Sequence, residues 1–291
     1  MRIVTRPDFD GIVCAVLLQE ALNIKKPVKW VEPNLMHQGT VNIQAGDIIA
    51  NLAYDQRCSL WFDHHTSNRI KTDFTGLFQL APSAARVIYG YYKNKLKKDF
   101  SELVKAADRI DSANLTEDEI LFPEKYPYIM LSNTITSSKG EDHVYWNFLV
   151  SMLRIRDIKK ILENHRVKSR VILVLKENQK YDKVLREHTR LIKHVSITDL
   201  RTFESTPSGN RFLVFCLYPV SNVNIKIRNH AQDKEKVIIS VGRSIFNRTC
   251  HVDIGKLCAR YGGGGHQGAG SCSFSRADFE KNIQEIIKVL I

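Results

Sequence analysis

Residues 1–22 read MRIVTRPDFDGIVCAVLLQEAL, and this stretch indicates the fold class. The apolar run over residues 1–5 stops at Arg6-Pro7-Asp8, which predicts a short buried strand and then a turn. Residues 12–22 are apolar on most faces of a helix, which predicts a buried helix. A buried strand that leads directly into a buried helix is typical of a parallel sheet with helices on both faces.

The same alternation continues over the first half of the chain. Further strands are predicted over residues 28–31, 47–54 and 59–62. Further helices are predicted from an N-cap at Ser83 to residue 96, over residues 100–109, and from residue 142 onward. We therefore expect residues 1–150 to form an α/β domain with a mainly parallel sheet covered by helices.

The second half of the chain has a different pattern. Residues 151–193 are basic and largely helical in pattern, so we expect a helical linker whose charges form a solvated face. Strands are predicted over residues 195–198, 212–217, 223–227 and 237–241. A helix over 253–260, a glycine-rich loop over 262–270 and a closing helix over 276–290 are expected to follow. We expect residues 194–291 to form a smaller α+β domain.

The composition excludes some classes of protein and favours one kind of partner. Hydrophobic residues make up 43% of the 291 residues and charged residues 25%, which excludes a disordered or fibrous chain. The chain has 43 Lys and Arg against 31 Asp and Glu, a formal net charge of +12. This excess favours a polyanionic partner such as a nucleic acid, a nucleotide or polyphosphate. A merely soluble basic surface is the alternative.

Hydropathy and cysteine spacing indicate the compartment. No apolar run approaches the roughly 18–20 residues that cross a membrane, and Arg6, Asp8 and Asp10 interrupt any signal-peptide core. The six cysteines are scattered and form no C-x-x-C pair, which indicates reduced thiols and argues against a cysteine zinc site. We expect a cytoplasmic protein with no membrane partner, and we allow for a homodimer.

Two polar clusters follow predicted strands, where parallel sheets gather ligands. Asp8 and Asp10 come after the first strand, and together they could bind a hard cation or simply cap the next helix. Asp63-His64-His65 end a later strand and offer oxygen and nitrogen ligands together. That mixture suits Mn²⁺, Fe²⁺, Co²⁺ or Zn²⁺, and a polar surface loop is the alternative.

Two further features could serve a phosphorylated ligand. Asp108 and Asp111 lie at a predicted helix C-terminus, where the helix dipole disfavours acids, so a cation or a salt bridge would explain them. Residues 261–270 read YGGGGHQGAG, which lacks the Lys-Ser/Thr of a P-loop but could wrap an anion with its amides. Arg243 and Ser244 could add a guanidinium and a hydroxyl to that site.

In their order along the chain, these motifs resemble those of the DHH phosphoesterase superfamily, with its DHH-associated substrate-binding domain in the C-terminal half. The resemblance implies metal ligands at Asp8, Asp10, His64 and Asp111, with Asp108 the competitor of Asp111. It implies that Asp63, His64 and His65 are the catalytic residues. It also implies that the substrate is held by Arg243, Ser244, Gly263, Gly264, Gly265, His266, Ala269 and Gly270.

The sequence departs from the superfamily pattern at two usual metal-ligand positions. Val4 stands where the superfamily has a histidine, and Asn51 stands where it has a bridging aspartate, with Asp47 or Asp55 as possible substitutes. Valine cannot bind a metal, and a neutral amide oxygen bridges two cations poorly. We therefore expect one of the two metal positions to be weakened or lost.

The resemblance implies a metal-dependent phosphoesterase that hydrolyses phosphodiester or phosphomonoester bonds of short oligonucleotides or nucleotides. The expected cofactor is Mn²⁺, with Mg²⁺, Co²⁺ or Fe²⁺ as alternatives, in one or two ions. The alternative functions are an exopolyphosphatase-like hydrolase and a non-catalytic binder of phosphorylated ligands with a degenerate metal site.

Overall fold

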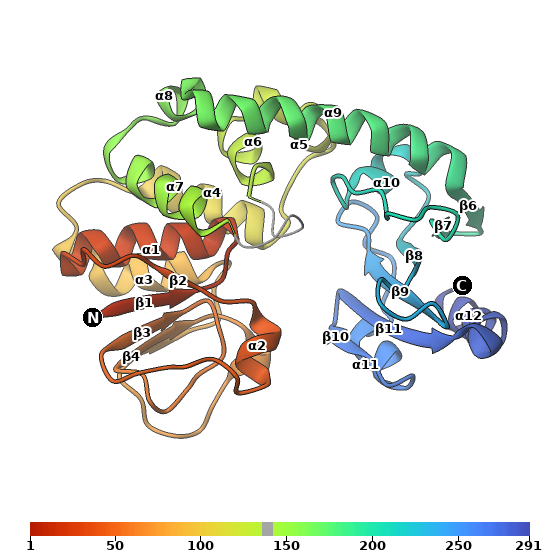
Figure 1. The fold of residues 1–291 in the computed structure, drawn as a ribbon, viewed down its shortest axis with the longest axis horizontal. Helices are drawn as coiled ribbons and strands as arrows, with labels where there is room; N and C mark the ends of the chain where they lie inside the picture. The colour runs from red at the N-terminus through yellow and green to blue at the C-terminus, as the bar shows by residue number, and fades with distance from the viewer. Residues whose placement is uncertain (136–141) are drawn as a thin grey trace. The chain divides into compact units, whose positions relative to one another are not determined.

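A computed structural model describes residues 1–135 and 142–291, and the chain divides into two compact units (Figure 1). Unit 1 consists of Met1–Leu115 and Pro123–Val171, and unit 2 of Thr116–Phe122 and Ile172–Ile291. The long helix α9 (His165–His188) therefore begins in unit 1 and continues in unit 2.

Unit 1 is built on a five-stranded sheet in which every neighbouring pair of strands is parallel. In spatial order its strands are β2 (Lys29–Trp30), β1 (Arg2–Thr5), β3 (Asp47–Ala50), β4 (Leu60–Asp63) and β5 (Gly76–Phe78). The predicted α/β class with a parallel sheet is confirmed. Because the strands are parallel, the residues that follow β1, β3 and β4 lie along the same edge of the sheet.

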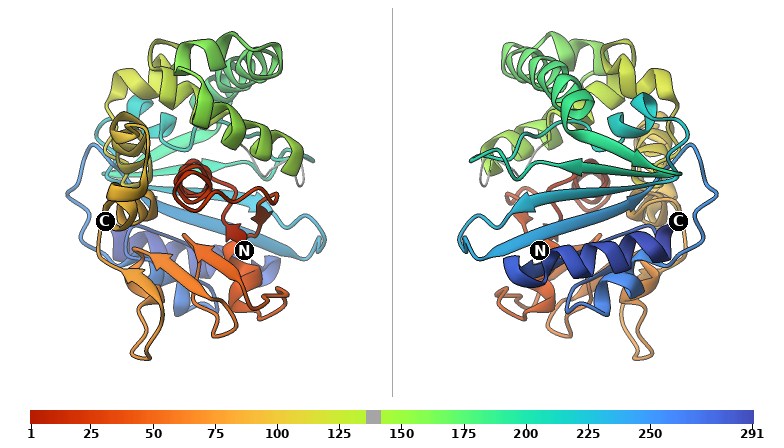
Figure 2. Two further views of the ribbon diagram at one scale, coloured as in Figure 1. Left: turned by 90° about the vertical axis from the view of Figure 1, so that its left-hand side faces the viewer. Right: turned by 90° about the vertical axis from the view of Figure 1, so that its right-hand side faces the viewer.

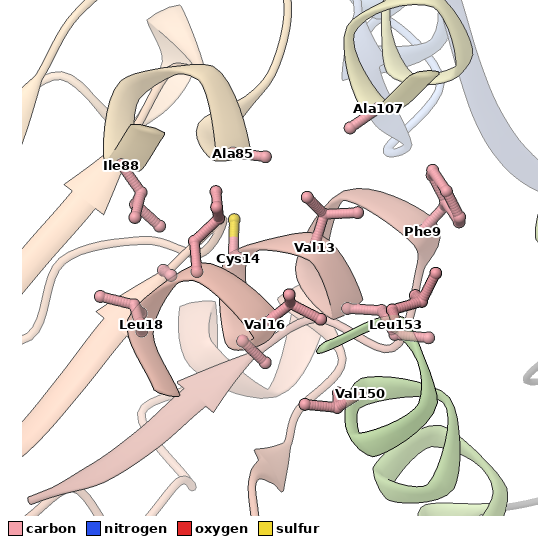
Figure 3. Packing of buried hydrophobic residues seen from close by; sticks show 14 of the residues in the cluster. Phe9, Val13, Cys14, Val16, Leu18, Ala85, Ile88, Ala107, Val150 and Leu153 are labelled. Atoms are coloured by element: carbon pink, nitrogen blue, oxygen red, sulfur yellow. The ribbon is translucent and has the colours of Figure 1, made fainter. Parts of the chain in front are cut away.

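Helix α1 (Phe9–Leu22) is enclosed by other helices, as its apolar sequence predicts. Side chains from α3 (Ala85, Ile88), α4 (Ala107) and α7 (Val150, Leu153) surround it (Figure 3). The helix begins three residues earlier than the pattern indicates, because the Asp8 carboxylate accepts a hydrogen bond from the Gly11 N–H at 2.8 Å and caps it.

Some of the remaining helices of unit 1 begin at recognisable side-chain caps. Ser83 caps α3 (Ala84–Tyr92) by accepting from the Arg86 N–H, as predicted, and Asp142 caps α7 (His143–Ile155). The other helices are α4 (Ser101–Asp111), α8 (Ile158–Glu163) and the short α2 (Pro33–His37) and α6 (Pro127–Asn133), the last two of which the sequence did not predict. In the described part of this unit, 3₁₀ turns cover Thr66–Asn68, Lys93–Lys95 and Pro123–Lys125.

Unit 2 contains a six-stranded mixed sheet in the order β10-β11-β9-β8-β7-β6. Only β7 and β8 pair in parallel; the other neighbours are antiparallel. Its strands are β6 (Thr189–Ile192), β7 (Val195–Asp199), β8 (Val223–Asn229), β9 (Lys236–Arg243), β10 (Gly264–His266) and β11 (Ala269–Ser275). Helix α12 (Arg276–Leu290) lies along this sheet (Figure 2) and packs with α11 (Ile254–Ala259) against its apolar face.

Four sequence-based element predictions are wrong or too long. Residues 213–217 form helix α10 (Leu213–Leu217), which packs against α5 (Glu117–Leu121), because a short apolar run does not distinguish a strand from a buried helix. Residues 189–192 leave the helical pattern as strand β6, joined to β7 by a 2.9 Å contact between the Thr189 and Thr198 hydroxyls. Strand β3 ends at Ala50, four residues before the predicted end. Part of the predicted glycine loop is a β-hairpin.

Of the helices that the structure describes, none has both the length and the hydrophobicity that a bilayer-spanning segment needs.

Two glycines in helices predict opposite effects of an added methyl group. A Cβ at Gly11 would lie 1.9 Å from the Arg6 carbonyl oxygen, whereas a Cβ at Gly90 in α3 would meet nothing within 4 Å. We expect Gly11→Ala to destabilise the protein by about 1–3 kcal/mol or more through overpacking. The matched control Gly90→Ala should stabilise it by about 0.5–1 kcal/mol, because alanine favours the helix. Urea unfolding of both variants measures this, and equal effects would contradict the packing of α1 against β1.

Candidate metal centre

Asp10 is a buried carboxylate that serves two helices. It is the second residue of α1, its exposed fraction is 2%, and its two oxygens accept hydrogen bonds from the Ala84 and Ala85 N–H groups, each at 2.9 Å. It therefore also occupies the N-terminus of α3, where a negative charge is favoured. Burial raises the pKa of Asp10 well above its usual range, and the carboxylates of Asp111 and Asp8 raise it further.

His64 follows β4, and its tautomer is fixed by a backbone carbonyl. Its Nδ1 lies 2.9 Å from the Ala81 carbonyl oxygen, which can only accept, so Nδ1 carries the proton. The Nε2 atom then presents a lone pair, is buried, and makes no hydrogen bond within the described residues. It lies 3.3 Å from Asp111 Oδ2 and 3.9 Å from Asp10 Oδ2. Burial lowers the pKa of His64, with a further contribution from His65, which favours this neutral form.

This arrangement fits a cation. One donor atom each from Asp10, His64 and Asp111 lies within 4.8 Å of the others. Without a cation, a nitrogen lone pair and two carboxylates would face one another in a partly buried space, where their repulsion is weakly screened. One nitrogen and two oxygen donors suit Mn²⁺, Fe²⁺, Co²⁺ or Zn²⁺. The structure therefore brings together three of the residues predicted to bind metal: Asp10 from the first turn of α1, His64 from the residue after β4, and Asp111 from the end of α4.

Asp63 positions His65. Asp63 is fully buried, and its Oδ1 accepts from the His64 N–H at 2.9 Å and lies 2.8 Å from His65 Nδ1, while its Oδ2 accepts from the Asn68 amide at 2.7 Å. Burial alone would lower the pKa of His65, but the hydrogen bond and the charge of Asp63 outweigh it and raise the pKa. Asp63 thus fixes the ring of His65, whose Nε2 remains for a ligand.

Asp8 and Asn51 form a pair beside Asp10. The Asn51 amide donates to Asp8 Oδ1 at 3.1 Å, and the Arg6 guanidinium lies 3.1 Å from Asp8 Oδ2. Asn51 is buried in the left-handed conformation with φ 55°, and its Oδ1 makes no hydrogen bond within the described residues. Asn51 thus donates an N–H to Asp8, whereas an aspartate at position 51 would repel the Asp8 carboxylate.

Three other aspartates considered from the sequence are engaged by arginines. Asp108 accepts from Arg86 Nε and from the Ser83 hydroxyl, at 2.8 and 2.7 Å, and it does not join the three donor atoms. Asp47 and Asp55, the suggested substitutes for the missing bridging aspartate, are paired with Arg2 and Arg57.

The polar residues predicted to bind substrate in unit 2 make local hydrogen bonds. The Arg243 guanidinium donates to the Val252 carbonyl, with Nε at 2.9 Å. The Ser244 hydroxyl accepts from the Phe246 and Asn247 N–H groups at 3.1 and 3.0 Å. His266 is exposed, and its Nδ1 accepts from the Gly268 N–H at 3.1 Å.

The glycines of the 261–270 segment are in part required by the hairpin. A Cβ at Gly263 would lie 2.1 Å from the Ser271 carbonyl oxygen, and one at Gly265 would lie 2.2 Å from that of Ala269. Gly265 also has φ +152°. By contrast, a Cβ at Gly264 would meet nothing within 4 Å. Gly270 pairs with Gly265 across β10 and β11, and Ala269 pairs with His266. Glycine at 263 and 265 thus has a packing reason of its own and does not by itself indicate phosphate binding.

Sequence reasoning missed the backbone groups that hold the site together. The N–H groups of Ala84 and Ala85 and the carbonyl of Ala81 orient Asp10 and His64. The N-cap at Ser83 was the available signal, because it predicts a helix N-terminus whose free N–H groups can bind a carboxylate such as Asp10. Asn68 gave no signal, because its contact with Asp63 depends on the turn that follows β4.

The chain is similar to several solved structures. A pGpG-specific phosphodiesterase, PggH from Vibrio cholerae, is 32% identical, matches 99% of this chain and 98% of its own, and gives a TM-score of 0.83. An exopolyphosphatase-related protein from Bacteroides fragilis (13% identity, 99% and 93% coverage, TM-score 0.54) shares the fold. So does exonuclease RecJ bound to manganese (11% identity, 97% and 88% coverage, TM-score 0.54). No family model and no curated protein sequence matches the chain.

The raised pKa of Asp10 predicts how Mn²⁺ affinity depends on pH. Mn²⁺ must displace the proton that Asp10 retains, so Mn²⁺ affinity should increase as the pH rises through the raised pKa of Asp10. In the metal-free protein, the free energy of unfolding should fall as the pH rises through the raised pKa of Asp10. The reason is that a carboxyl whose pKa is raised by folding ionises more readily in the unfolded chain, so its ionisation disfavours the folded state. Thermal unfolding with Mn²⁺ and with EDTA measures both effects.

Two matched variants test whether Asp10 binds the metal: Asp10→Asn, which removes the proposed ligand, and Asp55→Asn, which is the control. Asp10→Asn should weaken Mn²⁺ binding by about 100-fold or more. Even the loss of a residue that only orients a metal ligand lowers metal affinity by about 10–100-fold. Asp55→Asn removes a half-buried carboxylate that pairs with Arg57 and lies outside the three-donor cluster, so it should leave Mn²⁺ binding unchanged. Equal Mn²⁺ affinity of the two variants would place the metal elsewhere.

Proposed function

Because the chain belongs to the DHH phosphoesterase superfamily, we propose that it is a metal-dependent phosphodiesterase that hydrolyses short linear dinucleotides such as pGpG. The identity of 32% over nearly the full length of a pGpG-specific phosphodiesterase supports this substrate class. The observation that carries the proposal is the buried Nε2 of His64, which lies between the carboxylates of Asp10 and Asp111 and accepts no hydrogen bond from any described residue.

The cation would be held by Asp10, His64 and Asp111. When bound there, a divalent cation such as Mn²⁺ supplies Lewis-acid polarisation of the phosphoryl group and activation of water at neutral pH. Ala84, Ala85 and Ala81 hold two of the three ligands through backbone hydrogen bonds, so these side chains are in place before substrate arrives.

His65 is the residue that we assign to the phosphodiester itself. Its Nδ1 is held by Asp63, and the raised pKa keeps the ring protonated toward higher pH, so Nε2–H can donate to a phosphoryl oxygen. In hydrolysis of pGpG, water attacks phosphorus, the bond from phosphorus to the 3′ oxygen breaks, and that oxygen takes a proton. The two products are then 5′-mononucleotides.

The departures at Val4 and Asn51 favour a single strongly held cation. Val4 is fully buried in β1 and packs in an apolar cluster with Ile49 and Trp61, so it cannot take the place of a histidine ligand. Asn51 binds Asp8 through its amide nitrogen. A second cation would have to rely on Asp8 and the neutral Asn51 Oδ1, which together form a weaker site.

We expect purified protein to convert pGpG to GMP with Mn²⁺, to stop in EDTA, and to recover when Mn²⁺ is restored. Product formation can be followed by ion-exchange chromatography, with inorganic polyphosphate as a competing substrate class. Preferred hydrolysis of polyphosphate would favour the exopolyphosphatase-like function. Tight binding of pGpG with no turnover of either substrate would instead identify a non-catalytic binder.

The neighbouring histidines give a matched pair of variants. His64→Ala should lose both activity and Mn²⁺ binding, because it removes a ligand. His65→Ala should lower kcat by about 10²–10³-fold while Mn²⁺ affinity stays nearly constant, because it removes only a hydrogen-bond donor to the phosphoryl group. Loss of Mn²⁺ binding in both variants, measured by isothermal titration calorimetry, would contradict these separate roles.

A further inference from the structure

Arg6 lies beside the metal centre, on a part of the chain that packing holds in place. It is the residue after β1 and belongs to the turn before α1. Its carbonyl oxygen is so close to α1 that a Cβ at Gly11 would lie 1.9 Å from it. The next residue, Pro7, is buried, and its ring restricts the backbone further. The backbone that carries the Arg6 side chain is therefore fixed.

The Arg6 guanidinium has one ionic partner and unused donors. Its Nε lies 3.1 Å from Asp8 Oδ2, and no other described residue accepts a hydrogen bond from it or forms an ion pair with it. A guanidinium carries five N–H donors in a planar fork, so the edge formed by Nη1 and Nη2 is left for another acceptor. The side chain is 41% exposed, so a ligand can reach that edge.

Asp8 is surrounded by donors and holds Arg6. Its Oδ1 accepts from the Gly11 N–H at 2.8 Å and from the Asn51 amide at 3.1 Å, and its Oδ2 faces Arg6. Among the residues that the structure describes, Asp8 is not part of a group that gathers three possible metal-ligand atoms. A second cation bound to Asp8 would have to displace the guanidinium, because two positive charges on one carboxylate repel each other.

The positive charge of Arg6 reaches the residues of the metal centre. Burial and the charge of Arg6 both act to lower the pKa of His65, although Asp63 outweighs them and raises it. The Asp8 carboxylate that holds Arg6 acts in turn on Asp10. Arg6 therefore lies within electrostatic range of the residue that we assign to the phosphodiester.

We propose that the free edge of the Arg6 guanidinium binds the non-bridging oxygens of the scissile phosphodiester, and that Asp8 and Asn51 position it for this contact. A guanidinium matches two phosphoryl oxygens with parallel N–H donors and keeps its charge at physiological pH. When water attacks phosphorus, negative charge develops on these oxygens, and Arg6 stabilises it in place of a second cation. The identity of the substrate rests on the proposed function.

The test measures binding of a pGpG analogue in which a CH₂ group replaces the bridging 3′ oxygen, so that this bond cannot be hydrolysed. In calorimetry of the full chain with Mn²⁺, Arg6→Met should weaken binding by about tenfold or more. Methionine keeps the apolar stem of the side chain, so the loss reports the charge-assisted contact. Arg6→Lys should retain part of the affinity, because it keeps the charge but not the fork.

The same variants are then compared in hydrolysis of pGpG. Arg6→Met should lower kcat by about 10²–10³-fold, while its Mn²⁺ affinity stays nearly constant, because Arg6 is not a metal ligand. Arg57→Met is the matched control, because Arg57 forms a similar ion pair with Asp55 in the same unit and is 47% exposed. It should leave analogue binding, kcat and Mn²⁺ affinity unchanged.

The Arg6 contact is overturned if Arg6→Met and Arg57→Met bind the analogue equally, or if Arg6→Met loses Mn²⁺ binding together with activity. If wild type binds the analogue through Arg6 but never hydrolyses pGpG, the proposed function fails and the Arg6 contact stands. If Arg6→Met hydrolyses pGpG as fast as wild type, the proposed function stands and the Arg6 contact fails.

Discussion

The structure of the site depends on one interaction, the docking of the buried Asp10 carboxylate on the first two N–H groups of α3. It ties the β1–α1 turn to α3 and directs the carboxylate toward His64 and Asp111. The N–H groups stabilise the ionised form, while burial and two neighbouring carboxylates oppose it. A cation resolves this conflict, which is why we interpret the cluster as a metal centre rather than as a structural ion pair.

Unit 1 supports this interaction by packing rather than by surface charge. Helix α1 is buried on nearly all sides, and Gly11 lets it approach the Arg6 carbonyl closely enough to place Asp10 inside the protein. His64 is held in the same way, by the Ala81 carbonyl on one side and by its place at the end of a buried strand on the other. The donor atoms are therefore preorganised by the core, as catalytic metal sites require.

Local patterns predicted the alternation of strands and helices in unit 1, helix α1 and the cap at Ser83, because each depends on residues close together in the sequence. The parallel pairing was inferred from that alternation, since it joins residues far apart in the sequence. It failed for α10, where a short apolar run suits a helix as well as a strand, and for β6, whose pairing with β7 is a tertiary contact. Asp10, His64 and Asp111 could be predicted from their motifs. The engagement of Asp108 by Arg86 could not, because it joins side chains of two different helices.

The most direct test of the central claim is an anomalous difference map from crystals of this protein soaked with Mn²⁺ and measured near the manganese absorption edge. Our account expects a strong peak in contact with His64 Nε2 and with oxygens of Asp10 and Asp111. A second peak between Asp8 and Asn51, if present, should be weaker. No peak at His64, or a strong one only at another site, would contradict the account.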